Sequence, residues 1–191
     1  TALEKRLTQR IGPAGGSVHL GRSRNDQVLT ALRLYLRDAA ETLRTGAAQV
    51  ADSLDGLAAR EHGTPLPGYT HMQRAQPISL AHHFLAHVEA VRRDRERLAQ
   101  ARVRTAVSPL GAAALSGSPH PVDPRLTAAE LGLPATFRNS VDAVADRDFL
   151  VDFVYVAALA AVHASRLAEE LVLWCSAEFG FAQFSDGHAT G

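Results

Sequence analysis

Residues 27–60, QVLTALRLYLRDAAETLRTGAAQVADSLDGLAAR, decide the fold class of this chain. Apolar residues recur along this stretch at alternating steps of three and four positions, which places them on one stripe of an α-helix: Leu29, Leu32, Leu36, Ala39, Leu43, Ala47, Val50, Leu54 and Leu57. Ser23, followed three positions later by Asp26, marks the start of the helix with an arrangement related to a capping box. We therefore predict one long helix from Gln27 to about Arg60.

Two more long helices are predicted after a break over residues 63–68. Pro77 is suited to the first turn of the second helix, whose apolar side is formed by Leu80, Ala81, Phe84, Leu85, Val88, Val91 and Leu98. The third helix is expected from about Ala143 to Ser176, and because residues 149–164 are apolar on nearly every face, we expect it to be buried on all sides. We find no alternation of apolar and polar residues with the two-residue period of a strand. The predicted fold is therefore all-α, a bundle of long helices.

Composition and charge exclude several broad classes of function. The chain has 191 residues and equal numbers of basic and acidic side chains, so it has no general attraction to nucleic acid or to an anionic membrane. Its most apolar stretch, residues 153–162, is too short to span a bilayer. The lone Cys175 cannot form an internal disulfide, and nothing resembles a secretion signal, so we expect a cytoplasmic protein. The residues at both ends resemble internal parts of a protein, so we expect the chain to be part of a longer protein.

Hydrogen-bond donors crowd the start of the first long helix, where Arg22, Arg24 and Asn25 lie. Free backbone N–H groups and the helix dipole already favour an anion there, and a guanidinium can hold a carboxylate in a two-point contact. The motif is therefore a candidate carboxylate site. Capping and surface salt bridges are the alternative interpretation, stronger for Arg22 and Asp26 than for Arg24 and Asn25.

A second motif, Thr70-His71, falls between Pro and Gly residues ahead of the second helix. Such a position leaves an imidazole accessible, and histidine gives or takes protons near neutral pH. His71 is therefore a candidate acid or base. The alternative is a histidine that stabilises the loop, with its ring nitrogens bonded to the backbone.

Two other groups of polar residues favour structural roles. His83 and His87 lie four positions apart, a spacing used by metal ligands, but no acidic or cysteine pattern completes a site, so we predict no metal. Asn, Asp and Arg residues gather over positions 139–148 at the start of the third helix, where capping and dipole complementarity explain most of them.

The two candidate motifs cannot meet within one chain if the helix between them is continuous. A helix from Gln27 to Arg60 is about 50 Å long, whereas the eleven residues from Arg60 to His71 span at most about 37 Å when fully extended. A pocket that contains both His71 and Asn25 would therefore be assembled from different subunits, which predicts an oligomer.

The motifs at residues 21–27 (GRSRNDQ) and 67–77 (PGYTHMQRAQP) resemble the first two signature regions of the argininosuccinate lyase family, a branch of the fumarase/aspartase superfamily. The similarity extends to residues 107–111, 139–149 and 178–181. It implies that residues 1–22 end an N-terminal domain and its entry loop. Residues 23–191 would then form the central helical-bundle domain of the superfamily fold, incomplete on its C-terminal side.

The resemblance also implies a reaction, the reversible elimination of argininosuccinate to L-arginine and fumarate, with no metal or organic cofactor. Family members are homotetramers whose active sites take residues from three chains. By the resemblance, His71 is catalytic as one half of an acid/base pair, while Arg24, Asn25 and Thr70 bind substrate. The other catalytic residue of the family is a serine in a loop that would begin at Gly191, so residues 1–191 alone are expected to be inactive.

Two positions depart from the family pattern. Leu20 stands where a threonine is usual, which removes a hydroxyl beside the first motif, and Met72 replaces a leucine of similar size. The competing hypothesis is a non-catalytic helical protein derived from the same fold, either truncated or crystallin-like. Continuation of the reading frame into the serine loop would distinguish the enzyme from that alternative.

Overall fold

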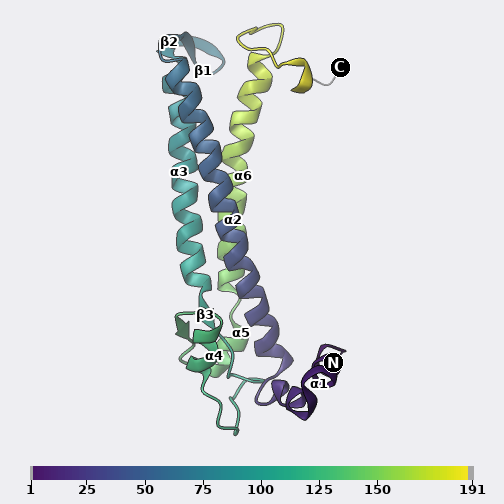
Figure 1. The fold of residues 1–191 in the computed structure, drawn as a ribbon. Coiled ribbons are helices and arrows are strands. Elements are labelled where there is room, and N and C mark those ends of the chain that lie inside the picture. Colours follow the sequence, from purple (N-terminus) through teal and green to yellow (C-terminus); the bar gives the residue numbers. More distant parts are fainter. Residues whose placement is uncertain (1, 189–191) are drawn as a thin grey trace. The chain divides into compact units, whose positions relative to one another are not determined.

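The computed structural model describes residues 2–188 of the chain. Its α-helices are α1 (Ala2–Ile11), α2 (Arg24–Arg60), α3 (Leu80–Thr105), α4 (Pro124–Glu130), α5 (Ser140–Ala145) and α6 (Asp148–Trp174), with the 3-10 helices η1 (Gly12–His19) and η2 (Asp186–His188) (Figure 1). The strands are β1 (Pro65–Thr70), β2 (Gln73–Ser79), β3 (Val107–Ser108) and β4 (Ala135–Thr136). The long helices dominate, so the predicted all-α class is confirmed.

The chain forms two compact units, and each has its own core. Unit 1 comprises Thr1–Glu41 and Gln100–Phe153, and unit 2 comprises Thr42–Ala99 and Val154–Gly191. Each of α2, α3 and α6 contributes residues to both units. The predicted domain division between residues 22 and 23 stays a prediction.

Unit 1 is organised around a buried arginine. One of its apolar clusters contains Leu29, Leu36 and Phe149. The Arg33 guanidinium lies 3.9 Å from the centre of the Phe149 ring and 5.0 Å from that of Phe137, a cation–π arrangement. Arg33 donates to the carbonyl of Thr105 (3.2 Å) and pairs with Asp146. Burial lowers the pKa of Arg33, and Asp146 opposes that effect, so the buried charge is compensated.

Unit 2 has a larger apolar core drawn from α2, the hairpin strands, α3 and α6. Its buried members are Ala51, Leu54, Ala58, Leu66, Ala81, Phe84, Val88 and Trp174. The helical stripe predicted from the sequence is only partly covered, because Leu43 and Val50 are each 46% exposed. Both line an apolar groove of about 730 Å³ within this unit.

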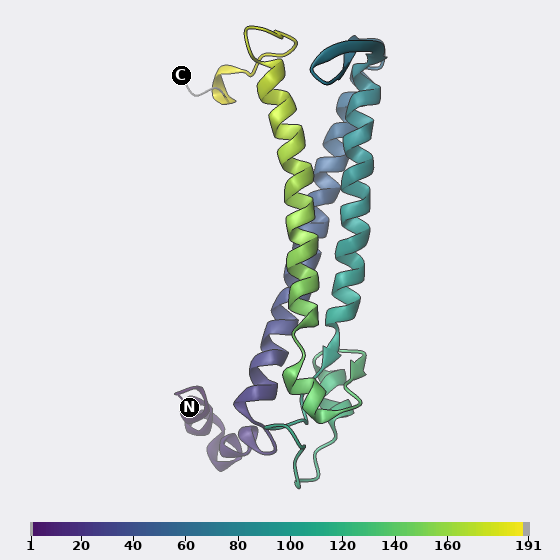
Figure 2. The same ribbon diagram turned by 180° about the vertical axis from the view of Figure 1, so that it is seen from behind.

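The segment between α2 and α3 is an antiparallel hairpin of β1 and β2, which the sequence prediction missed (Figure 2). Pro77, predicted in the first turn of a helix, instead lies in β2 opposite Pro67. The helix begins three residues later at Leu80, whose N–H donates to the carbonyl of Thr64 (2.9 Å). Placement of Pro77 in the helix was therefore wrong. Pro67 and Pro77 therefore lie opposite each other in the hairpin. Proline has no backbone N–H, so neither residue can donate a hydrogen bond across the two strands at this position.

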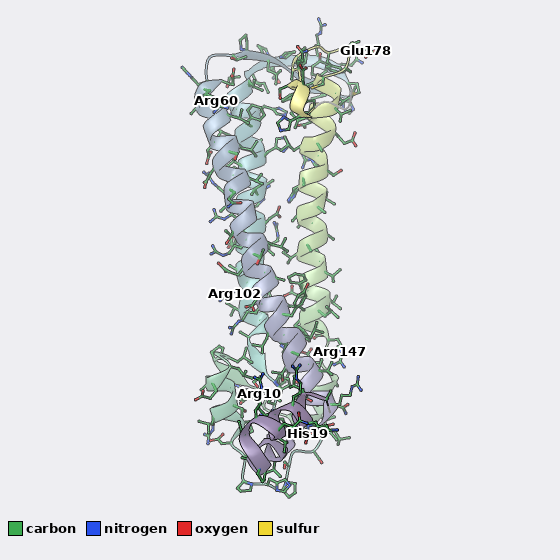
Figure 3. All side chains as sticks on the ribbon, turned by 45° about the vertical axis from the view of Figure 1, so that its right-hand side comes forward. Arg10, His19, Arg60, Arg102, Arg147 and Glu178 are labelled. Carbon is green, nitrogen blue, oxygen red and sulfur yellow. The ribbon has the colours of Figure 1, made fainter. Side chains whose placement is uncertain are left out.

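The third predicted helix is divided into α5 and α6. The Asp146 side chain accepts a hydrogen bond from the N–H of Asp148 (2.9 Å) and so caps α6, while Arg147, labelled in Figure 3, lies at the break. The prediction that this helix is buried on all sides was wrong for the described chain. Phe149 and Val156 are buried, but Val151, Val154, Tyr155 and Val162 are more than half exposed.

By length and composition alone, α6 could cross a membrane, with a mean hydropathy of 1.5 over its most apolar 18 residues, of which 11% are buried. The sequence analysis took only residues 153–162 as the apolar stretch, so it underestimated the length of the apolar segment. Polar contacts nevertheless tie the helix to α3 within each unit. Asp152 accepts two hydrogen bonds from Arg104 (2.7 and 3.0 Å), and His163 pairs with the buried Asp94 (2.7 Å). These contacts indicate a helix that packs against protein.

Candidate active site

Asp26 organises the first motif. Its carboxylate is 0% exposed and accepts the N–H of Ser23 (3.0 Å), which completes the predicted capping arrangement at the start of α2. Its second oxygen accepts the N–H groups of Gly111 (3.3 Å) and Ala113 (2.9 Å). Asp26 is therefore a structural residue, as the capping interpretation proposed, but it is buried and also holds the loop that follows β3.

The loop that follows β3 has a backbone suited to this contact. Gly111 has φ +101°, and a Cβ atom there would lie 2.4 Å from Cγ of Pro124, so glycine is required at this position. Ala113 also has a positive φ, 51°. The Asn25 side-chain amide donates to the carbonyl of Ala114 (3.0 Å), which fixes the orientation of that amide beside the start of the helix.

Arg24 and Arg22 differ in their surroundings. Arg24 is exposed in the first turn of α2, and within residues 2–188 no carboxylate pairs with it. The surface ion-pair interpretation thus has no support at this position. Arg22 is half-buried and lines a cavity of about 50 Å³ together with Leu20. The first motif therefore presents one exposed guanidinium and one oriented amide at a helix N-terminus, where an anion is favoured.

The second motif forms the turn of the β1–β2 hairpin. Thr70 pairs with Gln73, so His71 and Met72 are the two turn residues, with φ of 53° and 60°. A type I′ hairpin turn requires positive φ at both positions, and non-glycine residues rarely adopt it. Thr70 and His71 are exposed, and across residues 2–188 the His71 ring has no hydrogen-bond partner. The loop-stabilising interpretation of His71 therefore gains no support from this chain.

An aromatic cluster supports the hairpin next to His71. The ring of Tyr69 lies 5.4 Å from that of Phe179 and 6.4 Å from that of Phe181, and the two phenylalanines meet edge to face at 5.5 Å. The N–H of Phe181 donates to the carbonyl of Trp174 (2.8 Å), which returns the segment after α6 toward the end of that helix. Such pairs stabilise by about 0.5–1.5 kcal/mol each, so residues 178–181 help to hold the strand that carries Thr70.

The four predicted site residues fall into two pairs. Arg24 and Asn25 belong to unit 1, and Thr70 and His71 belong to unit 2. Arg24 and Asn25 begin α2, whereas Thr70 ends β1 and His71 follows it in the turn. The structure thus gives each motif a defined local geometry, and their roles stay predictions.

A third polar group was missed by the sequence analysis. Glu170 of α6 lies against the two histidines of α3, with its Oε2 atom 2.7 Å from Nε2 of His83 and 2.6 Å from Nε2 of His87. The expectation that no acidic residue completes the histidine pair was therefore wrong. Burial raises the pKa of Glu170, but the hydrogen bonds from the two histidines outweigh that effect, so the pKa is lowered overall.

Comparison with known proteins places these motifs in a family context. The sequence profile of the lyase family matches residues 1–191. Curated argininosuccinate lyases from Synechococcus sp. (strain CC9605) and Desulforudis audaxviator (strain MP104C) are each 54% identical, over 100% and 99% of this chain. The chain covers 40% and 41% of those proteins, so it spans about two fifths of their length. The crystal structure of EDDS lyase in complex with formate matches with a TM-score of 0.90 and 32% identity, over 95% of this chain and 37% of that one.

Proposed function

This chain belongs to the lyase family, and we propose that the protein of which it forms part is an argininosuccinate lyase. Such an enzyme reversibly splits argininosuccinate into L-arginine and fumarate. The observation that carries the proposal is the 54% identity to curated argininosuccinate lyases over essentially the whole chain. Identity at that level, together with an exposed His71 and an exposed Arg24, favours a working enzyme over a crystallin-like structural derivative.

The proposed chemistry is acid–base elimination and uses no cofactor. A base removes a proton from the carbon beside a substrate carboxylate, the carbon–nitrogen bond breaks, and an acid delivers a proton to the departing guanidino nitrogen. His71 is one half of this acid/base pair, because its imidazole is exposed on a constrained turn and has no competing partner among the described residues. Charge that develops on the carboxylate is stabilised by hydrogen-bond donors.

Substrate binding is assigned to three residues. Arg24 provides a permanent positive charge at the start of α2, and the amide of Asn25 is oriented beside it by Ala114. Thr70 offers a hydroxyl next to His71 at the end of β1. Together they would hold the carboxylates of argininosuccinate while proton transfer takes place.

The active enzyme is proposed to be a cytoplasmic homo-oligomer, a tetramer by family resemblance, with neither nucleic acid nor membrane as a partner. Two observations support self-association. The first is the length argument made from the sequence, in which the eleven residues from Arg60 to His71 are too few to run back along a helix from Gln27 to Arg60, so a pocket with both motifs would need more than one subunit. In unit 2, the apolar groove and the exposed face of α6 offer surfaces for neighbouring copies.

Fumarate release from argininosuccinate by the complete protein, followed by absorbance, tests the function. The wild-type protein should turn over, and His71→Asn should lower kcat by about 10²- to 10⁴-fold, the range for one general acid or base. His62→Asn is the matched control, because His62 is another exposed histidine of unit 2. Absence of turnover in the wild type would reject the proposed reaction. A His71→Asn enzyme as active as the His62→Asn control would reject the catalytic role.

A further inference from the structure

The histidine and glutamate cluster of unit 2 brings three potential metal ligands to one point. The α-helical spacing of four places His83 and His87 on one face of α3, with their ring centres 5.4 Å apart. Glu170 reaches them from α6. One ligand atom of each residue lies within 4.8 Å of the other two, and both histidines present the same atom, Nε2, to the carboxylate.

These atoms are the types that zinc prefers. Two imidazole nitrogens and one carboxylate oxygen form a recurrent Zn²⁺ ligand set, with bonds of about 2.0–2.2 Å. Tetrahedral bonds of that length separate neighbouring ligand atoms by about 3.3 Å. The present separations of 2.7 and 2.6 Å from Glu170 would widen by less than 1 Å on metal binding. Glu170 can make a change of that size by side-chain adjustment, because its side chain is about one third exposed.

The surroundings hold the histidines in place and leave room for a further ligand. The His83 ring lies 5.0 Å from the indole of Trp174, and His87 is only 8% exposed, so both rings are restrained by packing. The cluster opens onto a cavity of about 170 Å³, which is large enough for a water as fourth ligand. Arg93 and Arg166 also line this cavity, but both are exposed, so solvent screens their positive charges.

We propose that His83, His87 and Glu170 form a binding site for a divalent transition metal of the zinc type, which links α3 to α6 within unit 2. Ligand chemistry favours Zn²⁺ or Co²⁺ over Mg²⁺ and Ca²⁺, because two of the three donors are imidazoles. The site stabilises the packing of two helices and takes no part in the elimination. It is therefore independent of the proposed reaction.

Metal binding can be measured directly on the complete protein after treatment with a chelator. Titration with Zn²⁺ by calorimetry should show one site per chain, and Co²⁺ should give the visible absorption bands of a site with nitrogen and oxygen ligands. His87→Gln and Glu170→Gln should each weaken Zn²⁺ binding by at least about 100-fold. Loss of a residue that only supports a metal ligand weakens metal binding by up to about 100-fold, and loss of a direct ligand should cost at least as much. His82→Gln is the matched control, because His82 is the adjacent, exposed histidine of α3.

The alternative is a hydrogen-bonded triad in which both histidines donate to Glu170 without any metal. Circular dichroism of each variant first establishes that it is folded, and Glu170→Gln keeps the shape of the side chain. Wild-type protein that binds Zn²⁺ no more tightly than its His87→Gln variant would overturn the proposal. Equal weakening by His82→Gln and His87→Gln would overturn it as well. Neither result depends on lyase activity, so this test and the test of the proposed function can fail separately.

Discussion

Replacing Asp26 with Ala tests whether one buried carboxylate joins the start of α2 to the loop after β3. The native side chain is 0% exposed and accepts backbone hydrogen bonds from Ser23, Gly111 and Ala113. Alanine removes every acceptor and leaves these three N–H groups without a partner in a partly buried environment. The local structure should therefore open more often in the variant than in the wild type.

The magnitude follows from the three bonds. Loss of a helix cap costs about 1 kcal/mol, and each buried N–H left without a partner costs about 1–3 kcal/mol, so the total is roughly 3 kcal/mol or more. The two loop bonds account for about 2 kcal/mol of this, which corresponds to roughly 30-fold faster amide exchange in residues 108–117. Asp26→Asn keeps one acceptor oxygen and should show about half of the effect on stability.

Hydrogen exchange followed by mass spectrometry on the complete protein is the assay, because it resolves the loop from the rest of the chain. Asp52→Ala is the matched control, since Asp52 is an exposed carboxylate on the same helix. The loop of the Asp26→Ala variant should exchange much faster than that of the control. If both variants exchanged at rates within about twofold of each other, the loop would be held by other contacts and the reasoning would be refuted.

Three further predictions concern binding, backbone strain and completeness. Arg24→Ala should raise KM for argininosuccinate and leave kcat nearly unchanged, because one charge-assisted contact of roughly 1.5–3 kcal/mol is lost; steady-state kinetics would contradict this if kcat fell equally. Gly111→Ala should lower the melting temperature by several degrees, because the new Cβ would lie 2.4 Å from Pro124 at φ +101°; calorimetry showing no change would mean that the loop relaxes. Residues 1–191 alone should release no fumarate in the absorbance assay, and turnover at a normal enzymatic rate would place the second catalytic group within them.

Local sequence signals predicted the first long helix and the caps at Asp26 and Asn139 well. The start of α2 was predicted at Gln27 and lies at Arg24, because Ser23 and Asp26 close the cap one turn earlier than the apolar stripe begins. The end at Arg60 matched. The Asn139 side chain caps α5 by accepting hydrogen bonds from the N–H groups of Val141 and Asp142. The polar residues at this position had indicated such a cap.

The hairpin was missed because its prolines conceal the strand signal. Pro65, Pro67 and Pro77 suggest a loop or a helix start, and only the pairing of two separate segments makes β1 and β2 a sheet. His71 and Met72 adopt a left-handed backbone in the turn, but neither is a glycine or asparagine, the residue types that usually indicate such a turn. That constrained position of the candidate catalytic histidine therefore could not be read from residue types.

The sequence by itself determined that long helices dominate the chain, where the first of them lies, and which two motifs carry polar groups suited to carboxylate binding and proton transfer. These features depend on neighbours within a few positions, through helical periodicity, capping bonds and side-chain chemistry. Only the tertiary structure decided that Glu170 meets His83 and His87, and that Asp26 is buried beneath the loop at Gly111. These contacts join residues more than 80 positions apart, and their free energy arises only after the helices have packed, so no local pattern encodes them.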